Sequence, residues 1–386
     1  MRKINILYVV TQLELGGAQK QLLSLIHRID KERYKLFLFT AQTGVLMDEA
    51  LSISDLTLYP SKHLKRPISF LSDFLTIIEI ARFIKKNEID IVHTHSSKAG
   101  ILGRWAGALA KAKTIIHTVH GWSFNDFQNP FLRKLYRGLE KISAKITNKI
   151  IVVSDHDRQK GLDHKIGSYD QYSLLRYGID RARFGIRDLS IRKELEISND
   201  ALVIGTIACF KPQKAPEDFV RLASLLSQIL PQARFLMVGD GVLRKKIERS
   251  IAQFNLGSRF ILTGWRKDIA RILSAMDIFV LTSLWEGLPV AILEAMVSRV
   301  PIVATHTGGI SEVIAEGETG FLVPCHDMSS MLEKIRVLLQ DASLKNRIIQ
   351  NAKQCVDEKF DMETMVKAHE DLYQKLVEAK GMAHVC

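Results

Sequence analysis

Glu286 and Glu294 are the two side chains whose type and spacing first point to chemistry. They lie eight positions apart in the stretch "SLWEGLPVAILEAM". The preceding "DIFVLTS" predicts a buried strand, "LWEG" a loop, and "PVAILEAM" a helix that begins at Pro289. The free amides and the dipole at a helix start attract anions, and Gly287 lets a phosphate approach the backbone. Glu294, about 7 Å further along the helix axis, is then placed to accept hydrogen bonds from ribose hydroxyls.

Glu286 must point beside such a phosphate, because a carboxylate repels it. Its partners would be sugar hydroxyls or a developing positive charge. The alternative interpretation is an exposed loop glutamate followed by a glutamate on a solvated helix face, and the local stretch alone favours neither.

Glycine pairs and turns follow other predicted strands. They are Gly16–Gly17 in "LELGGAQKQLL", Gly239–Gly241 in "MVGDG" and Gly308–Gly309 in "THTGGISEV". Each alone is compatible with an ordinary tight turn. The first is not a GxGxxG motif and has no acidic ribose-binding partner, which disfavours a dinucleotide-dependent dehydrogenase. Together, in both halves of the chain, they favour a nucleotide-sugar site.

Basic residues and histidines lie at further predicted strand ends. Lys211 and Lys214, in "FKPQKAPED", could neutralise a diphosphate or be ordinary surface charge. His120 lies where "HTVHGWSF" leaves a strand, and it could contact a substrate or be structural. His93 and His95 share one face of a strand in "HTHSSKAG", but no carboxylate or cysteine accompanies them, so no metal site is expected.

The composition indicates a two-domain enzyme that stays in the cytoplasm. The chain has 386 residues, of which 47% are hydrophobic and 25% charged. The four cysteines (Cys209, Cys325, Cys355 and Cys386) form no CxxC pair, which suits a reducing compartment. No apolar run reaches the roughly 20 residues of a membrane span. The stretch "MRKINILYVVTQLE" is interpreted as a first buried strand rather than a signal.

The net charge of +12 lies entirely in the first half of the chain. Residues 1–190 contain 30 Lys and Arg against 18 Asp and Glu, whereas residues 191–386 contain 24 of each. This asymmetry favours one domain that faces anionic lipid or an anionic substrate over a uniformly basic nucleic-acid binder.

A basic amphipathic helix is predicted at "FLRKLYRGLEKISAKITNK". Its cations at four-residue steps are Arg133, Arg137, Lys141, Lys145 and Lys149. Its apolar residues, expected to pack on the sheet, are Leu132, Leu135, Tyr136, Leu139, Ile142 and Ile146. The basic edge would meet anionic headgroups, with a solvated charged face as the alternative.

Short apolar runs alternate with amphipathic segments along the whole chain. The strand-like runs are "INILYVV", "KLFLFT", "DIVHTH", "TIIHTVH", "KIIVVS", "LVIGTIA", "RFLMVG", "RFILTG", "DIFVLTS" and "PIVAT". This alternation predicts an α/β protein with two doubly wound, Rossmann-like domains that face a central cleft, with ligands at the carboxyl ends of the strands. The pattern pauses over residues 184–200, where we place the linker.

The whole chain resembles a GT-B-fold retaining glycosyltransferase of family 4, of the type found in bacterial capsule, lipopolysaccharide and exopolysaccharide synthesis. The stretches that carry the resemblance are "GGAQ", "HTHSSKAGILGRWAG", "HTVHGWSF", "GDGVLRKKIE", "DIFVLTSLWEGLPVAILEAM" and "PIVATHTGGISEVIAEGETGFLV". The resemblance implies an acceptor-side domain over residues 1–187, a nucleotide-sugar-binding domain over 188–362, and a C-terminal helix over 363–386 that crosses back to the first domain.

The resemblance also assigns roles to residues. Glu286, near the transferred sugar, and His120 are the expected catalytic residues, and Glu294 is expected to hold the ribose. The donor-binding residues are expected to be Gly17, Lys211, Lys214, Trp265, Gly287, Leu288, Val290 and Glu294. The acceptor-side residues are expected to be His95, Lys98 and Arg104.

The sequence departs from the family pattern at three positions. Cys209 replaces an arginine, with Lys211 as the candidate substitute for its charge, and Gln19 replaces a glutamate. Tyr177, in "YGID", replaces the asparagine of an Asn-Gly-Val-Asp turn. These changes bear on how the diphosphate is neutralised.

The expected activity is retaining transfer of a hexosyl or N-acetylhexosaminyl group from a nucleotide sugar, with a UDP-sugar favoured, to a glycan or lipid-linked acceptor. No cofactor, metal or nucleic acid is expected, and the protein is expected at the inner face of the membrane as a peripheral protein. Two alternatives are a GT-B-fold sugar-nucleotide epimerase, which needs no acceptor, and a non-catalytic scaffold at the membrane surface.

Overall fold

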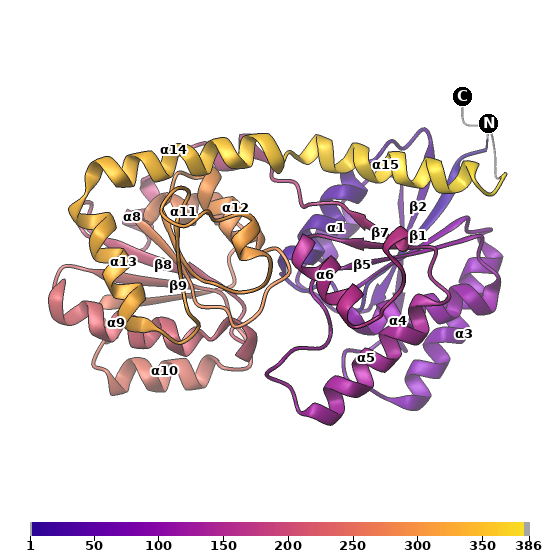
Figure 1. Ribbon diagram of the computed structural model, residues 1–386, viewed down its shortest axis with the longest axis horizontal. Helices are drawn as coiled ribbons and strands as arrows, with labels where there is room; N and C mark the ends of the chain where they lie inside the picture. The colour runs from indigo at the N-terminus through magenta and orange to yellow at the C-terminus, as the bar shows by residue number, and fades with distance from the viewer. Residues whose placement is uncertain (1, 382–386) are drawn as a thin grey trace. The chain divides into compact units, whose positions relative to one another are not determined.

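The chain folds into two compact units, shown in a computed structural model that describes residues 2–381 apart from the side chain of Glu358 (Figure 1). The first unit runs to Gly178 and takes up the chain again from Met362, and the second runs from Ile179 to Asp361. Among the described residues, no helix has both the length and the apolar character needed to cross a bilayer.

The first unit is built on a seven-stranded parallel sheet in the order β3-β2-β1-β4-β5-β6-β7. The strands are β1 (Ile4–Val9), β2 (Tyr34–Ala41), β3 (Leu56–Ser61), β4 (Ile91–His95), β5 (Thr114–Val119), β6 (Lys149–Val152) and β7 (Tyr172–Leu174). The α-helices are α1 (Gly17–Arg28), α2 (Met47–Leu51), α3 (Phe70–Lys86), α4 (Ser97–Ala110), α5 (Pro130–Ala144), α6 (Asp155–Asp163) and α15 (Met362–Glu378).

Helices cover both faces of this sheet. Alternate residues of β1 point to opposite faces: Ile6 and Tyr8 share a core with residues of α1 and α15, while Leu7 and Val9 share one with residues of α3 and α4. The sheet is therefore buried on both sides, which explains why its central strands are continuous apolar runs in the sequence.

The second unit has a six-stranded parallel sheet in the order β10-β9-β8-β11-β12-β13. The strands are β8 (Val203–Ile207), β9 (Arg234–Val238), β10 (Phe260–Gly264), β11 (Ile278–Leu281), β12 (Ile302–Thr305) and β13 (Phe321–Val323). The α-helices are α7 (Arg181–Phe184), α8 (Ser190–Glu194), α9 (Pro216–Ile229), α10 (Arg244–Gln253), α11 (Ile269–Ala275), α12 (Val290–Val297), α13 (Met328–Gln340) and α14 (Ala342–Lys359). The α/β class with two doubly wound domains, predicted from the sequence, is confirmed.

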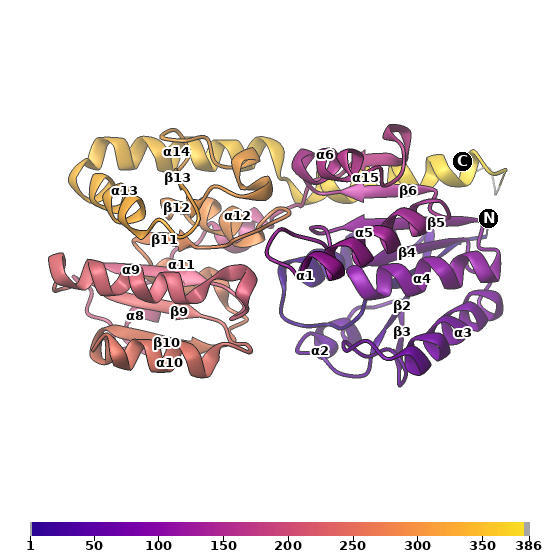
Figure 2. The same ribbon diagram turned by 60° about the horizontal axis from the view of Figure 1, so that its bottom comes forward.

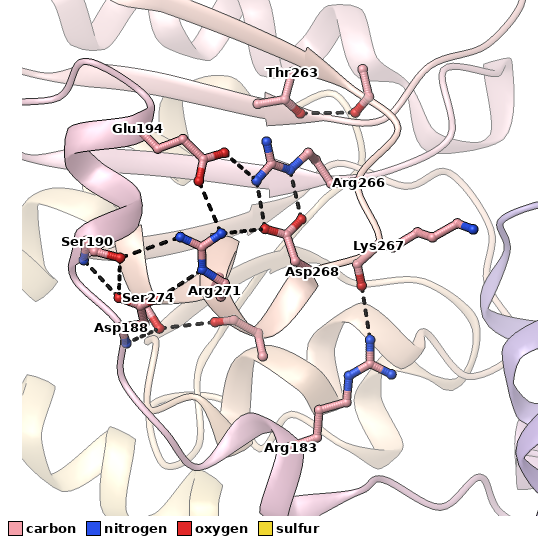
Figure 3. Close-up of polar contacts among 12 residues, drawn as sticks. Arg183, Asp188, Ser190, Glu194, Thr263, Arg266, Lys267, Asp268, Arg271 and Ser274 are labelled. Carbon is pink, nitrogen blue, oxygen red and sulfur yellow. Dashed lines mark hydrogen bonds and ion pairs between the residues drawn. The ribbon is translucent and has the colours of Figure 1, made fainter.

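Residues 184–200, expected to form the linker, are held on the second unit by ion pairs (Figure 3). Arg271 of α11 contacts Asp188 at 2.8 Å and Glu194 of α8 at 3.1 Å. Arg266 contacts the same Glu194 and also Asp268, both at 2.7 Å. Each exposed pair alone would contribute little, but the shared partners tie the segment to α11. The domain boundary expected between residues 187 and 188 therefore falls inside the second unit, which begins at Ile179.

The orientation of α5 differs from the expectation. Leu132, Leu135 and Ile142, expected to pack on the sheet, are 42%, 44% and 49% exposed. The buried residues of this helix are instead the small or polar Glu140, Ser143 and Ala144. The expectation that this apolar side is buried is therefore wrong for these three residues, which point outward, whereas Tyr136 of the same helix is partly buried and packs on the core.

Candidate functional site

Glu286 lies in the loop between β11 and α12, and its carboxylate is held by two neighbours. Oε1 of Glu286 contacts the ammonium of Lys214 and accepts a hydrogen bond of 2.6 Å from Oγ of Ser283. The residue is only 9% exposed. The ion pair and the hydroxyl donor together fix the position of this buried carboxylate, and a fixed carboxylate is suited to stabilise a developing positive charge.

The loop that carries Glu286 is shaped by glycine. Gly308 has a φ of +55°, and a Cβ atom added there would lie 1.9 Å from the carbonyl oxygen of Glu286. The neighbouring Gly309 donates its amide to the carbonyl of Gly287 at 3.0 Å. The glycine turn after β12 therefore lies directly against the Glu286 loop, so two stretches that the sequence analysis considered separately form one structure.

The helix after this loop begins as predicted. Pro289 is the N-cap of α12, and Glu294 lies within the helix at 6% exposure. Leu288 and Val290 are 4% and 7% exposed, so their side chains pack inward and it is the backbone at the helix start that can face an anion.

The other expected donor-binding residues of the second unit follow neighbouring strands. Lys214 ends a 3₁₀ turn after β8, with Lys211 as its N-cap, and Trp265 follows β10 and is 37% exposed. Because the carboxyl ends of parallel strands meet at one edge of a sheet, these residues and Glu286 lie along the same edge. Cys209 follows the same strand β8 and is half-buried.

In the first unit the expected site residues also follow strand ends. Gly17 begins α1 after β1, His95 ends β4, and His120 follows β5. The structure brings two of them together: Nδ1 of His95 lies 3.0 Å from Nε2 of His120. His95 is fully buried at 3% exposure, so it contacts His120 rather than solvent.

These histidines belong to a buried cluster that the sequence analysis did not foresee. Nδ1 of His120 lies 2.6 Å from the hydroxyl of Tyr177, and His93 is held between Tyr373 at 2.6 Å and Thr118 at 2.7 Å. Tyr373 lies on α15, far along the sequence, and no local signal pointed to it. These histidines are therefore buried jointly by β4, β5 and α15.

Burial sets the charge state of the cluster. Desolvation lowers the pKa of His120 to about 3 and that of His369, on α15, to about 4. The pKa values of His93 and His95 are lowered well below the ordinary range for the same reason. All four imidazoles are therefore neutral at pH 7, and neutral imidazole offers one donor and one acceptor.

Lys98 and Arg104, expected on the acceptor side, are engaged in internal contacts. Lys98 pairs with Asp73 at 2.5 Å and is held at the start of α4. Arg104 is completely buried and pairs with the buried Glu140 of α5 at 2.6 Å. Assignment of Arg104 to acceptor contact is therefore corrected: its guanidinium ties α4 to α5 and has no surface to offer a ligand.

Among residues 2–381, no group of three or more His, Cys, Asp or Glu side chains is arranged so that it could hold a metal ion. Both ring nitrogens of His93 lie within hydrogen-bond distance of hydroxyl groups, those of Tyr373 and Thr118.

Comparisons with known proteins agree with this arrangement. Residues 15–183 match the family described as Glycosyltransferase Family 4, and residues 188–355 match Glycosyl transferases group 1. An *Escherichia coli* relative, UDP-Gal:alpha-D-GlcNAc-diphosphoundecaprenol alpha-1,3-galactosyltransferase, is 31% identical over 97% of this chain and 98% of its own length. The capsular polysaccharide biosynthesis glycosyltransferase CapM of Staphylococcus aureus is 24% identical over 82% of this chain and 85% of its own length.

Among solved structures, Anabaena Alr3699/HepE in complex with UDP and glucose superposes with a TM-score of 0.84 at 19% identity, covering 96% of this chain and 99% of that one. At this identity the likeness shows the fold, which is that of the GT-B glycosyltransferases. The epimerase and scaffold alternatives are not favoured by these matches. The chain therefore belongs to the group 1 and family 4 glycosyltransferases, as its sequence resemblance indicated, and is a glycosyltransferase of the kind used in bacterial polysaccharide synthesis.

Proposed function

We propose that the chain transfers a hexosyl or N-acetylhexosaminyl group, with retention, from a UDP-sugar to a glycan or lipid-linked acceptor. The donor diphosphate would bind at the start of α12 with Lys214, and Glu294 would hold the ribose. Two comparisons support this choice of substrates: the *E. coli* relative is named for a UDP-galactose donor and a diphosphoundecaprenol-linked acceptor, and the Anabaena structure contains UDP and glucose.

The observation that carries the proposal is the setting of Glu286. Its carboxylate is buried at the carboxyl edge of the second sheet, held by Lys214 and Ser283, one short turn before a helix start. Glycosyl transfer passes through an oxocarbenium-like state, which a fixed carboxylate stabilises, while the leaving diphosphate needs the positive helix end and a cation. Lys214 would supply that cation. When the donor binds, the ammonium group of Lys214 would leave Glu286 and contact the diphosphate instead.

Product analysis tests this function. The protein is incubated with UDP-galactose, UDP-glucose, UDP-N-acetylglucosamine or UDP-N-acetylgalactosamine, with and without a polyprenyl-diphosphate-linked N-acetylglucosamine. Transfer to the lipid-linked sugar is expected with one donor, and Glu286→Gln is expected to lower kcat about 100-fold or more. Conversion of a donor to its epimer without acceptor would instead establish the epimerase alternative.

We propose further that the protein works at an anionic membrane surface. An outward apolar face lies on α5 and its neighbours, made up of Phe70, Leu71, Phe74, Trp105, Phe131, Leu135 and Ile142. On α5, Phe131, Leu135 and Ile142 recur at steps of four and seven residues and so form one stripe. The stripe lies opposite the buried side of the helix.

Neighbouring helices extend this apolar face. Helix α4 packs between α3 and α5 (Figure 2), and Nε1 of Trp105 donates to Oγ of Ser143 on α5 at 3.1 Å. Phe70 and Phe74, in the first turns of α3, are 91% and 60% exposed. Exposed aromatic groups of this number mark an interaction surface.

Charge complementarity supports anionic lipid as the partner. Residues 127–149 contain six Lys and Arg, and their one acidic residue, Glu140, is buried against Arg104. Lys134 on α5 and Lys145, the C-cap of α5, are exposed and flank the apolar stripe. A helix with apolar residues on its outer face and lysines beside them is suited to the headgroup region of an anionic bilayer.

Vesicle flotation tests the membrane proposal. Binding is expected to vesicles that contain phosphatidylglycerol, to weaken with salt, and to be lost with Phe131→Ser plus Leu135→Ser. The matched control is Leu225→Ser plus Val337→Ser, which changes two exposed apolar residues of the second unit. Absence of binding to anionic vesicles, or equal loss in the control, contradicts the proposal.

A further inference from the structure

His120 is held by both of its ring nitrogens. Nε2 lies 3.0 Å from Nδ1 of His95, and Nδ1 lies 2.6 Å from the hydroxyl of Tyr177, whose ring also stacks on the imidazole at 5.8 Å between centroids. A neutral imidazole must donate through one of these nitrogens and accept through the other. The direction of the chain of hydrogen bonds therefore decides which nitrogen of His120 carries the proton.

One end of this row of hydrogen bonds lies on α15. Nδ1 of His369 lies 2.8 Å from the carbonyl oxygen of Met365, and because a carbonyl only accepts, this nitrogen carries the proton and Nε2 of neutral His369 is an acceptor. His95 and His369 both line one small cavity of about 20 Å³, and Nε2 of His95 is buried and has no hydrogen-bond partner among residues 2–381. This volume suits one water molecule.

A water in this cavity that donates to Nε2 of His369 can either accept from Nε2–H of His95 or donate its second proton to Nε2 of His95. In the first of these two arrangements the water accepts from His95. Nδ1 of His95 is then an acceptor, so Nε2 of His120 donates to it. Nδ1 of His120 is left as an acceptor, and the hydroxyl of Tyr177 is the donor that satisfies it. Every polar group in the row then has one partner of the correct kind.

The position of Tyr177 is fixed by its surroundings. The residue is 5% exposed, and the next residue, Gly178, is held through both backbone groups by the side chain of Gln21: Nε2 of Gln21 donates to the carbonyl at 2.8 Å, and the Gly178 amide donates to Oε1 at 3.3 Å. From this turn the phenol side chain of Tyr177 reaches His120.

We propose that Tyr177 is a positioning residue for His120, whose hydroxyl fixes the imidazole as the tautomer with the proton on Nε2. The substrate then takes the place of His95 as acceptor of that proton. The kinetic part of this inference rests on the proposed glycosyl transfer and on the expected catalytic role of His120 in it; the tautomer is a property of the protein alone.

Replacement of Tyr177 by phenylalanine tests the inference, since it keeps the ring and removes the hydroxyl. We expect kcat to fall about tenfold, which corresponds to about 1.4 kcal/mol and is within the range for the loss of one hydrogen bond, with little change in the donor KM. In ¹⁵N NMR spectra of histidine-labelled protein, the His120 signals should move from the Nε2–H pattern toward a mixture of tautomers. The matched control is Tyr172→Phe, which removes another buried hydroxyl of the same unit, 2.6 Å from the Ile166 carbonyl, and should leave kcat and the His120 signals unchanged.

Two results distinguish the inference from the function on which it rests. If His120→Ala is inactive but Tyr177→Phe keeps both the turnover and the His120 signals of the wild type, the positioning role is overturned. If His120→Ala is fully active, the catalytic role of His120 is overturned and the kinetic part of the inference with it, while the ¹⁵N signals of Tyr177→Phe still decide whether Tyr177 sets the tautomer.

Discussion

The ammonium group of Lys214 contacts Oε1 of Glu286 in a largely buried ion pair, with side-chain exposures of 18% and 7%. The two residues lie far apart in the sequence, after β8 and after β11, and the parallel sheet brings them to one edge. Each is the electrostatic complement of the other before any substrate binds.

Loss of Lys214 should therefore destabilise the protein through Glu286. Lys214→Met leaves a buried carboxylate without its cation, and we expect the free energy of unfolding to fall by about 2 kcal/mol or more. Adding Glu286→Gln to this variant removes the unpaired charge and should recover much of the loss. Urea unfolding of the two single variants and the double variant measures the coupling, and simple additivity would show that the pair is not coupled.

Glu294 should contribute to donor binding. Glu294→Ala is expected to raise the Kd for UDP about tenfold or more, because buried hydrogen bonds between a carboxylate and ribose hydroxyls contribute about 1.5–3 kcal/mol. Glu333→Ala, which removes an exposed glutamate of α13 paired only with Arg336, should leave the Kd unchanged. Isothermal titration with UDP checks both, and an unaltered Kd for Glu294→Ala would remove its proposed ribose contact.

Gly308 should not tolerate a side chain, because the carbonyl group of Glu286 occupies the space that a Cβ atom would need. Gly308→Ala and Gly317→Ala both place alanine at a positive φ, +55° and +72°, but a Cβ at Gly317 meets nothing within 4 Å, whereas at Gly308 it meets the Glu286 carbonyl. The backbone strain alone costs about 1 kcal/mol, which Gly317→Ala should show. Gly308→Ala should cost about 3 kcal/mol or more in the free energy of unfolding and should also weaken UDP binding. If the free energy of unfolding fell equally in the two variants, the Glu286 loop would be able to move away from the added Cβ atom without cost.

The buried histidines should make the protein sensitive to mild acid. Burial lowers the pKa of His93, His95, His117, His120 and His369 in the folded state, whereas each titrates near 6.5 in the unfolded chain. Below about pH 6.5 the unfolded chain therefore binds more protons, and the free energy of unfolding falls by up to about 1.4 kcal/mol per pH unit for each group. Above pH 7.5 these groups contribute no slope.

Urea unfolding between pH 7.5 and 5 measures this slope, in a range where ordinary carboxylates still contribute little. Replacing His369 by glutamine removes one of the five groups and should make the dependence shallower. A variant with the same slope as the wild type would show that His369 is not held neutral.

The central strands of both sheets could be predicted from the sequence, and the three that were missed have a common cause. β3, β7 and β13 are each at an edge of their sheet. An edge strand is covered on fewer sides, so it needs fewer apolar residues, and "LTLYPS", "YSL" and "FLV" are too polar or too short to stand out. The ten strands with clear apolar runs are all present.

The candidate site likewise has features that the sequence predicted and features that it did not. Glu286, Gly287 and Glu294 were found because a strand, loop and helix in one short stretch carry a local pattern. The contacts of His120 and His93 with Tyr177 and Tyr373 were not predictable, because they depend on packing between distant segments; His93 and Tyr373 are 280 positions apart. Periodicity showed that α5 is amphipathic, but it could not show that Leu132, Leu135 and Ile142 face away from the sheet.

Helix α15 has a consequence for how the protein is made. Met365, Val366, Tyr373 and Val377 of this helix fill the same core as Ile6 and Tyr8 of β1, although the whole second unit lies between them in the chain. The ribosome therefore finishes every residue of the second unit before it supplies the piece that completes the first. The usual N-to-C order of domain completion during synthesis is reversed. While residues 179–361 are synthesised, the nascent first unit lacks the apolar side chains of α15 that complete its core.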